Sequence, residues 1–358
     1  MENKRIENSP SYLYIIKGIA IFLMIWGHCI QYCLKGSDLN VFDNGVFKFI
    51  YSFHMPLFML VSGYLFFFSF QKRELNELIA HRSKPLLFSI VFCGFFNYYI
   101  STGIESVLNG NFSALISGEW MSSLADLWFL WSVLISSVCV AVICKKVKNT
   151  FWQIILLCIS ASAFLVFPGI NLNLFMYPYF IIGFYFAKYK DKIPQRLMLL
   201  RYASIVLFPI MLMFYEEKHY IYTTGIIGGT YSIKDYIFID AFRWAIGLIG
   251  SVFVLTAVDV LFKLGYSKFK ASLLCKGLTE TGKNSLQIYC LSNAMLSGWL
   301  SFAFPFIVQA IGKNIFVNNM AVYNFLFTPC IALIYCIGLY YTVKLFDKIK
   351  LSKILFGR

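Results

Sequence analysis

Long apolar stretches alternate with short connections along this 358-residue chain, and every second connection is rich in Lys and Arg. A helix needs about 20 apolar residues to cross a bilayer. The stretches that approach or exceed this length lie at roughly 12–34, 47–70, 86–104, 124–144, 151–168, 172–187, 200–215, 236–262, 284–309 and 320–346. The pattern predicts an all-α, polytopic integral membrane helix bundle with about ten transmembrane helices.

The distribution of basic residues predicts the orientation of this bundle. Cytoplasmic loops of membrane proteins carry an excess of Lys and Arg. Most of the 31 Lys and Arg residues lie before the first stretch, after each even-numbered stretch or in the C-terminal tail. We therefore expect both termini in the cytoplasm and a single transmembrane domain over 1–358. The polar, glycine-containing connection 216–235 is expected to be an extracytoplasmic loop, partly re-entrant.

Composition supports a membrane protein over a soluble one. Only 13% of the residues are charged, about half of the roughly 25% that is usual in soluble domains. The net charge of +14 lies in short clusters between apolar runs, so we expect no nucleic-acid partner. The ten cysteines form no CxxC pair and no Cys/His cluster with zinc spacing, which predicts buried thiols and no metal site.

Ionisable residues inside the predicted spans are candidates for function, because a charge in lipid is costly. Lys17 and His28 lie eleven residues apart on the first helix, which is about 16 Å along its axis and nearly on one face. His54 enters the second helix at a similar depth, so the two histidines can approach each other. Lys17 can also simply extend to the interface. Asp240 and Arg243 are spaced as an ion pair, for which a structural role is the favoured interpretation.

Several motifs in this order resemble the acyltransferase 3 family of membrane acyltransferases, and the closest likeness is to its fucose 4-O-acetylase-like branch. They are Lys17–Ile21 with Trp26–His28, Phe53–Phe58 with Val61–Tyr64, Lys84–Leu87, Leu127–Leu130, Pro178–Gly183 and Gly282–Tyr289. The resemblance extends over nearly the whole chain. Three positions depart from the family pattern: Tyr14 stands where many members have Asp, Lys17 stands where Arg is common, and Ser292-Asn293 lies where a late His is frequent.

The resemblance implies acyl transfer to a sugar hydroxyl, with Lys17, His28 and His54 in the catalytic set. Histidine suits the removal of the hydroxyl proton, because its ordinary pKa of about 6.5 lies near the working pH. We expect His28 to act as general base or transient acyl acceptor. His54 would orient it or stabilise the oxyanion, although the two roles can be exchanged.

The resemblance also implies that acetyl-CoA or another acyl-CoA is the donor substrate, with no permanently bound cofactor. Lys17, Arg73, Arg82 and Lys84 are the candidates to hold its phosphates, since Arg and Lys bind phosphate oxygens. The basic cluster over 72–84 has a second explanation as a simple topology signal, and spacing alone does not decide between them. On the opposite side, the aromatic residues Trp120, Trp128 and Trp131 are candidates to stack on sugar rings.

Together these features predict a multi-pass enzyme of the inner (plasma) membrane that moves an acyl group, in the first place acetyl, to a sugar of a surface polysaccharide or lipid-linked glycan. Its expected partners are acyl-CoA, the sugar acceptor and the lipid bilayer. A transporter or flippase for a lipid-linked sugar is the leading alternative, and a structural subunit of a polysaccharide synthesis complex is another. The acyl group, the acceptor hydroxyl and the oligomeric state are left open by the sequence.

Overall fold

The protein is built of helices. The computed structural model describes residues 10–34, 39–117, 120–166, 171–226, 231–295 and 319–357. No strand occurs within these ranges. Seven of the helices in them are long and apolar enough to cross a membrane. The chain is therefore an all-α, polytopic membrane protein, as the apolar stretches predicted.

Each predicted stretch coincides with a helix or with the start of one. The main helices are α2 (Pro10–Cys33), α3 (Gly45–Lys72), α4 (Leu75–Asn109), α6 (Trp128–Lys146), α7 (Thr150–Val166), α8 (Asn171–Tyr189), α10 (Ser204–Met213), α12 (Ile233–Ala271), α13 (Leu273–Lys283), α14 (Ser285–Met295) and α18 (Thr328–Lys348). The short elements are η1 (Val41–Asp43), α5 (Ser113–Ser117), η2 (Trp120–Leu127), η3 (Lys190–Lys192), α9 (Gln195–Leu199), η4 (Leu200–Ala203), η5 (Glu217–His219), α11 (Ile221–Thr224), α17 (Met320–Val322), η7 (Tyr323–Phe327) and α19 (Leu351–Phe356). Beyond Met295 the predicted stretch 284–309 lies outside the described residues, so the count of ten spans and the cytoplasmic termini stay predictions.

Two connections expected to be loops are helical instead. The basic connection 72–84 is mostly the first part of α4, which begins at Leu75. Leu, Glu, Ala and Lys are good helix formers, so this helix continues past its apolar part. The connection 263–283 contains the end of α12 and the separate helix α13. This helix buries only one face, and the rest of its sequence is polar, so it was expected to be a loop. These helices extend the bundle beyond its apolar spans.

Glycines allow two pairs of helices to touch through their backbones. A Cβ on Gly63 of α3 would overlap the carbonyl oxygen of Phe180 in α8, and one on Gly183 would overlap that of Leu60. Small residues at helix crossings are typical of membrane bundles, where close backbone approach gains van der Waals contact. Two of the sequence motifs, Val61–Tyr64 and Pro178–Gly183, therefore mark one crossing point.

The same device joins α2 to α13. A Cβ on Gly18 would overlap the carbonyl oxygen of Leu278, and one on Gly282 would overlap that of Tyr14. The helix that carries Lys17 and His28 is thus held by the motif that begins at Gly282. The fold gives both glycine-containing motifs a packing role.

Polar contacts join elements that are far apart in the chain. On the side expected to be cytoplasmic, Asp259 near the end of α12 pairs with Arg201 of η4 at 2.7 Å. On the other side, Asn44 Nδ2 donates to Asn324 Oδ1 at 2.8 Å, and Asn40 Nδ2 donates to Glu217 Oε2 at 3.2 Å. These contacts join α12 to η4, and the segment before α3 to η7 and η5; which face is cytoplasmic stays a prediction.

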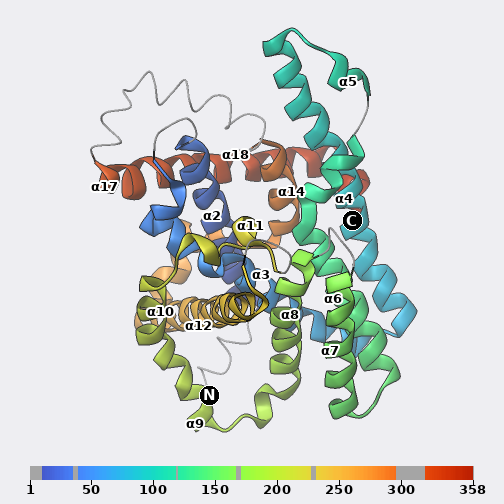
Figure 1. Cartoon of the computed structure of the whole chain (residues 1–358), viewed down its shortest axis with the longest axis vertical. Coiled ribbons are helices and arrows are strands. Elements are labelled where there is room, and N and C mark those ends of the chain that lie inside the picture. Colours follow the sequence, from blue (N-terminus) through green and yellow to red (C-terminus); the bar gives the residue numbers. More distant parts are fainter. Residues whose placement is uncertain are drawn as a thin grey trace.

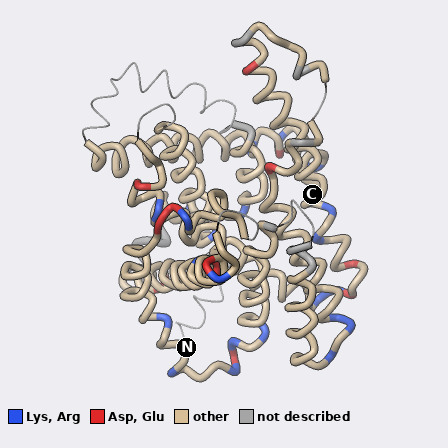
Figure 2. Tube along the Cα trace, viewed as in Figure 1, with Lys and Arg blue, Asp and Glu red and all other residues tan. Residues whose placement is uncertain are grey.

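The helices cross at steep angles and do not form a parallel bundle. Figure 1 shows α12 almost end-on and α18 running across the view, whereas α4, α6 and α8 run upright. In Figure 2 the Lys and Arg positions gather towards the bottom and right of the molecule, and the upper arm formed by the end of α4 and α5 has none. The centre of the crossing helices, under α11, is where the candidate site lies.

Candidate active site

His28 reaches the middle of the molecule on α2, and the two residues before it set its position. The indole Nε1 of Trp26 donates to Thr328 Oγ1 of α18 at 2.9 Å, which fixes α2 against the last long helix. Gly27 faces α3, where an added Cβ would lie 2.7 Å from Cε2 of Tyr51. Trp26 therefore anchors the helix, and Gly27 leaves the space that brings Tyr51 beside His28.

Tyr51 lies between the two candidate histidines. Its hydroxyl is 3.2 Å from His28 Nδ1, and its ring centroid is 4.9 Å from that of His54. The Tyr51 hydroxyl donates its proton to Oε1 of Gln31 at 3.2 Å, so its oxygen is free to accept from His28. This arrangement places the His28 proton on Nδ1 and leaves Nε2 as the basic nitrogen.

His54 is held in the same tautomer by the backbone. Its Nδ1 lies 2.9 Å from the carbonyl oxygen of Ile50, which can only accept, so Nδ1 carries the proton. The side chain is only 3% exposed, whereas His28 is half-buried. Both rings thus present an unprotonated Nε2, and His28 is the more accessible of the two.

Motifs from three helices converge beside this pair. The ring of Phe129 in α6 lies 5.8 Å from Phe58 of α3 and 5.6 Å from Tyr289 of α14. The exposed Asp126, in the turn before α6, interacts electrostatically with the hydroxyls of Tyr32 and Tyr289. The centre therefore combines two imidazoles, several tyrosine hydroxyls and one carboxylate.

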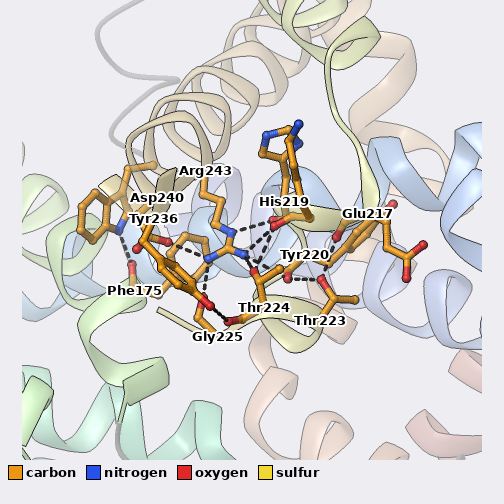
Figure 3. A network of polar contacts seen from close by, with 12 residues as sticks. Phe175, Glu217, His219, Tyr220, Thr223, Thr224, Gly225, Tyr236, Asp240 and Arg243 are labelled. Carbon is orange, nitrogen blue, oxygen red and sulfur yellow. Dashed lines mark hydrogen bonds and ion pairs between the residues drawn. The ribbon is translucent and has the colours of Figure 1, made fainter. Parts of the chain in front are cut away.

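Residues 216–226, which we call the cap segment, fold over this centre. They contain η5 and α11 and follow α10. Arg243 of α12 is 2% exposed and reaches into this segment, where its guanidinium donates to four backbone carbonyls and one hydroxyl (Figure 3). The acceptors are the carbonyl oxygens of Lys218 (2.8 Å), His219 (3.0 Å), Tyr220 (3.3 Å) and Gly225 (2.6 Å), together with Thr224 Oγ1.

The buried ion pair predicted in this helix is present. Arg243 Nη1 lies 2.6 Å from Asp240 Oδ1, with both side chains buried. A buried guanidinium needs a counter-charge and a full set of hydrogen-bond acceptors, and Asp240 and the cap segment provide both. The ion pair has a structural role, as expected. It stabilises the cap segment as well as the helix that carries it.

The cap segment has an inner and an outer tyrosine. Tyr220 is 2% exposed and packs on Phe47 and Tyr51 of α3, with ring centroids 5.6 and 6.3 Å away. Tyr222 is 53% exposed, and its ring meets the edge of Trp128 with the centroids 6.0 Å apart. Tyr51, both cap tyrosines and Arg243 are among the residues that line a cavity of about 20 Å³, which has room for about one water molecule.

His219 stabilises the cap segment as a neutral ring. Its Nδ1 accepts the backbone N–H of Glu216 at 2.9 Å, which requires that this nitrogen is unprotonated. Burial, assisted by the charge of Lys218, lowers the pKa of His219 to about 4. The ring is therefore neutral at physiological pH.

The four basic candidates are spread over three helices: Lys17 lies within α2, Arg73 directly follows α3, and Arg82 and Lys84 lie within α4. Lys17 is half-buried next to the α2–α13 crossing at Gly18. Arg73 pairs with Glu77 at 3.4 Å, and the Arg82 guanidinium lies 5.9 Å from the centre of the Phe66 ring. Lys84 is exposed. The structure brings His28 and His54 together, while the role of these cations as a phosphate site stays a prediction.

Tyr51, Asp126 and Tyr222 were not predicted as site residues from the sequence. Tyr51 carries a hydroxyl inside an apolar span one helical turn before His54, and this spacing is a signal that could have identified it. Of the three tryptophans, Trp128 lies at the site, whereas Trp131 donates to the carbonyl of Leu124. Within the described ranges, no three His, Cys, Asp or Glu side chains are grouped to hold a metal ion.

Comparison with known proteins gives one family and two relatives. The model of the acyltransferase 3 family, described as "Acyltransferase domain", matches residues 11–341. Nodulation protein NolL of Mesorhizobium japonicum is 30% identical over 48% of this chain and 46% of its own length. Nodulation protein NolL of Sinorhizobium fredii is 30% identical over 54% of this chain and 52% of its own. The chain thus spans about half the length of these curated relatives, and no solved structure matches it.

Proposed function

The chain belongs to the acyltransferase 3 family, and on that premise we propose that it is a membrane-bound O-acyltransferase. The acyl group, in the first place acetyl, moves from acyl-CoA to a sugar hydroxyl of a surface polysaccharide or lipid-linked glycan at the inner (plasma) membrane. The observation that carries this proposal is the group of His28, Tyr51 and His54. Two neutral imidazoles with free Nε2 atoms, in the middle of an apolar bundle, suit the removal of a hydroxyl proton.

In this proposal His28 is the general base. Its Nε2 takes the proton of the sugar hydroxyl as the oxygen attacks the thioester carbonyl. The C–S bond then breaks, CoA leaves as thiolate, and the proton passes from His28 to the sulfur. The greater exposure of His28 supports this role, and the backbone-fixed His54 would stabilise the developing oxyanion or orient its neighbour.

In this proposal the phosphates of the donor bind to Arg73, Arg82, Lys84 and Lys17. Arg82 and Lys84 project from the first turns of α4, and Lys17 lies on α2 below His28, so the separation along that helix, about 16 Å, is comparable to the length of a pantetheine arm. A phosphate group on these cations would leave the thioester free to reach the histidines.

The deciding experiment measures ester-linked acyl groups by NMR on purified surface polysaccharide. Cells with the intact protein are compared with cells carrying His28→Ala, and His81→Ala serves as control because it replaces an exposed histidine outside the site. We expect the ester signal to disappear only in His28→Ala, at equal protein level. Membranes should also release free CoA from acetyl-CoA, which a transporter would not do. An unchanged ester signal would remove His28 from the chemistry.

A further inference from the structure

We propose that Arg243 is a positioning residue for the acceptor. By clamping the cap segment it holds Tyr222 against Trp128, and these two rings form one wall of a subsite for an uncharged sugar. This inference rests on the proposed function and extends it to the class of acceptor and to the residues that select it. Neither Tyr222 nor Arg243 takes part in the acyl transfer itself.

Arg243 makes more hydrogen bonds than an ion pair with Asp240 requires. Asp240 alone would neutralise Arg243, and that contact uses one oxygen at 2.6 Å. The remaining donors of the guanidinium all go to the cap segment, between Lys218 and Gly225. A planar guanidinium has five N–H donors in a fixed fork, whereas a lysine ammonium has three on one atom. Arg243 therefore fixes the path of a whole loop, and a lysine cannot reproduce that geometry.

The path of the loop decides where its tyrosines lie. Tyr220 turns inwards and packs on Tyr51, the residue that contacts both histidines. Tyr222, two residues later, keeps 53% of its surface exposed while touching Trp128. One short segment thus contacts the catalytic centre with one ring and offers the second ring to a ligand beside it.

The chemistry of this exposed wall fits a neutral sugar. Tyr and Trp present large, rigid, apolar faces with one polar group each, which suits the C–H face of a pyranose ring and its hydroxyls. Asp126 adds an exposed carboxylate that can accept hydrogen bonds from sugar hydroxyls and would repel an acidic sugar. The positive charge of Arg243 does not offset this repulsion of an acidic sugar, because the guanidinium is buried and paired with Asp240.

The test uses the full chain in detergent and measures trypsin cleavage after Lys218, within the cap segment, by mass spectrometry. Arg243→Lys should be cut about tenfold faster or more, because local opening sets the rate of cleavage. Arg201→Lys is the matched control, since its ion pair with Asp259 also involves α12 but not the cap segment. If Arg243→Lys does not fold, Thr224→Val removes one acceptor and leaves the ion pair intact. Equal cleavage of the variant and the wild type would refute the clamp.

The subsite is tested with methyl glycosides of galactose, fucose and N-acetylglucosamine, and with methyl glucuronide as the acidic probe. A neutral glycoside should slow cleavage after Lys218 in the wild type but not in Tyr222→Ala, and the glucuronide should have no effect. In acetyl transfer, Tyr222→Ala should raise the acceptor KM about tenfold, with the kcat and the acetyl-CoA KM unchanged. Tyr341→Ala, which removes an exposed tyrosine of α18, should change none of these.

The outcomes separate this inference from the proposed function. Protection by a neutral glycoside without acetyl transfer would keep the subsite and refute the enzyme activity. Acetyl transfer without protection by any probe, or with donor and acceptor KM rising together in Tyr222→Ala, would keep the activity and refute the subsite. Protection by methyl glucuronide equal to that by the neutral glycosides would refute selection by charge.

Discussion

The hydroxyl of Tyr51 lies 3.2 Å from Nδ1 of His28 and joins α3 to α2 at the centre of the molecule. This contact fixes the tautomer of the proposed base. We expect Tyr51→Phe to lower kcat about tenfold or more, since it removes one hydrogen bond to the base but keeps the ring that packs between the histidines. Steady-state acetyl transfer with purified protein checks this, and an unchanged kcat would mean that another group orients His28.

Gly27→Ala should reduce activity more strongly than it reduces the stability of the fold. The new methyl group would meet the ring of Tyr51 at 2.7 Å, and the ring must move away from His28. We expect a loss of kcat similar to that of Tyr51→Phe, and no further loss when both changes are combined, because they act on one contact. Full additivity of the two effects would contradict this explanation.

Gly63→Ala should destabilise the bundle. Its Cβ would overlap the backbone of Phe180, and a helix backbone cannot yield as a side chain does. The expected cost is about 1–3 kcal/mol or more, seen as a lower melting temperature in detergent. Gly338→Ala is the control, because within the described part of the chain a Cβ built there meets no atom within 4 Å apart from the local backbone of its own helix. Equal melting temperatures for the two variants would show that α3 and α8 separate easily.

The cap segment should open as the pH falls. The pKa of His219, about 4, is below the ordinary value of 6.5, so the unfolded segment binds the proton more strongly than the folded one. The contribution of neutral His219 to the stability of the folded cap segment is complete above about pH 6.5. It is lost as the pH falls towards 4, and the population of the open segment rises by up to roughly tenfold per pH unit. Hydrogen exchange of residues 216–226, corrected for intrinsic rates, measures this opening. His219→Gln should abolish the pH dependence, and its persistence would assign it to another group.

Arg82→Gln combined with Lys84→Gln should raise the KM for acetyl-CoA without changing the acceptor KM. Contacts between phosphate and basic side chains near the surface weaken as salt rises, so the effect should be largest at low ionic strength. A matched double change in the C-terminal tail, Lys350→Gln with Lys353→Gln, should leave both KM values unchanged. If the tail variant has the same effect, the donor responds to overall charge and not to α4.

The membrane spans and the histidine pair were predictable because their signals are local. Apolar length identifies α2 and α3, and the matching depths of His28 and His54 follow from the opposite directions of these two helices. Helix α13 was missed because it buries only one face against α2, and the rest of its sequence is as polar as a loop. Length and hydropathy do not reveal such a helix.

The contacts of Arg243 with the cap segment could not be predicted from the sequence, for a different reason. The spacing of Asp240 and Arg243 predicted the ion pair, and the structure confirms it. Four of the five acceptors on the cap segment are backbone carbonyls, which every residue has, so no pattern of side chains marks them. Tyr222 likewise becomes informative only when the loop brings it to Trp128.

Because Arg243 binds mainly main-chain oxygens, most side chains of the cap segment can change without loss of its anchor. A substitution at Tyr222 leaves the backbone carbonyls that bind Arg243 in place, so this position can change while the anchor on α12 stays the same. A new acceptor preference would then arise by exchange of a few exposed residues. For protein engineering, the same property makes the loop replaceable: grafted sequences of equal length that keep glycine at position 225, where φ is +67°, and the threonines at 223 and 224 should dock on an unaltered α12.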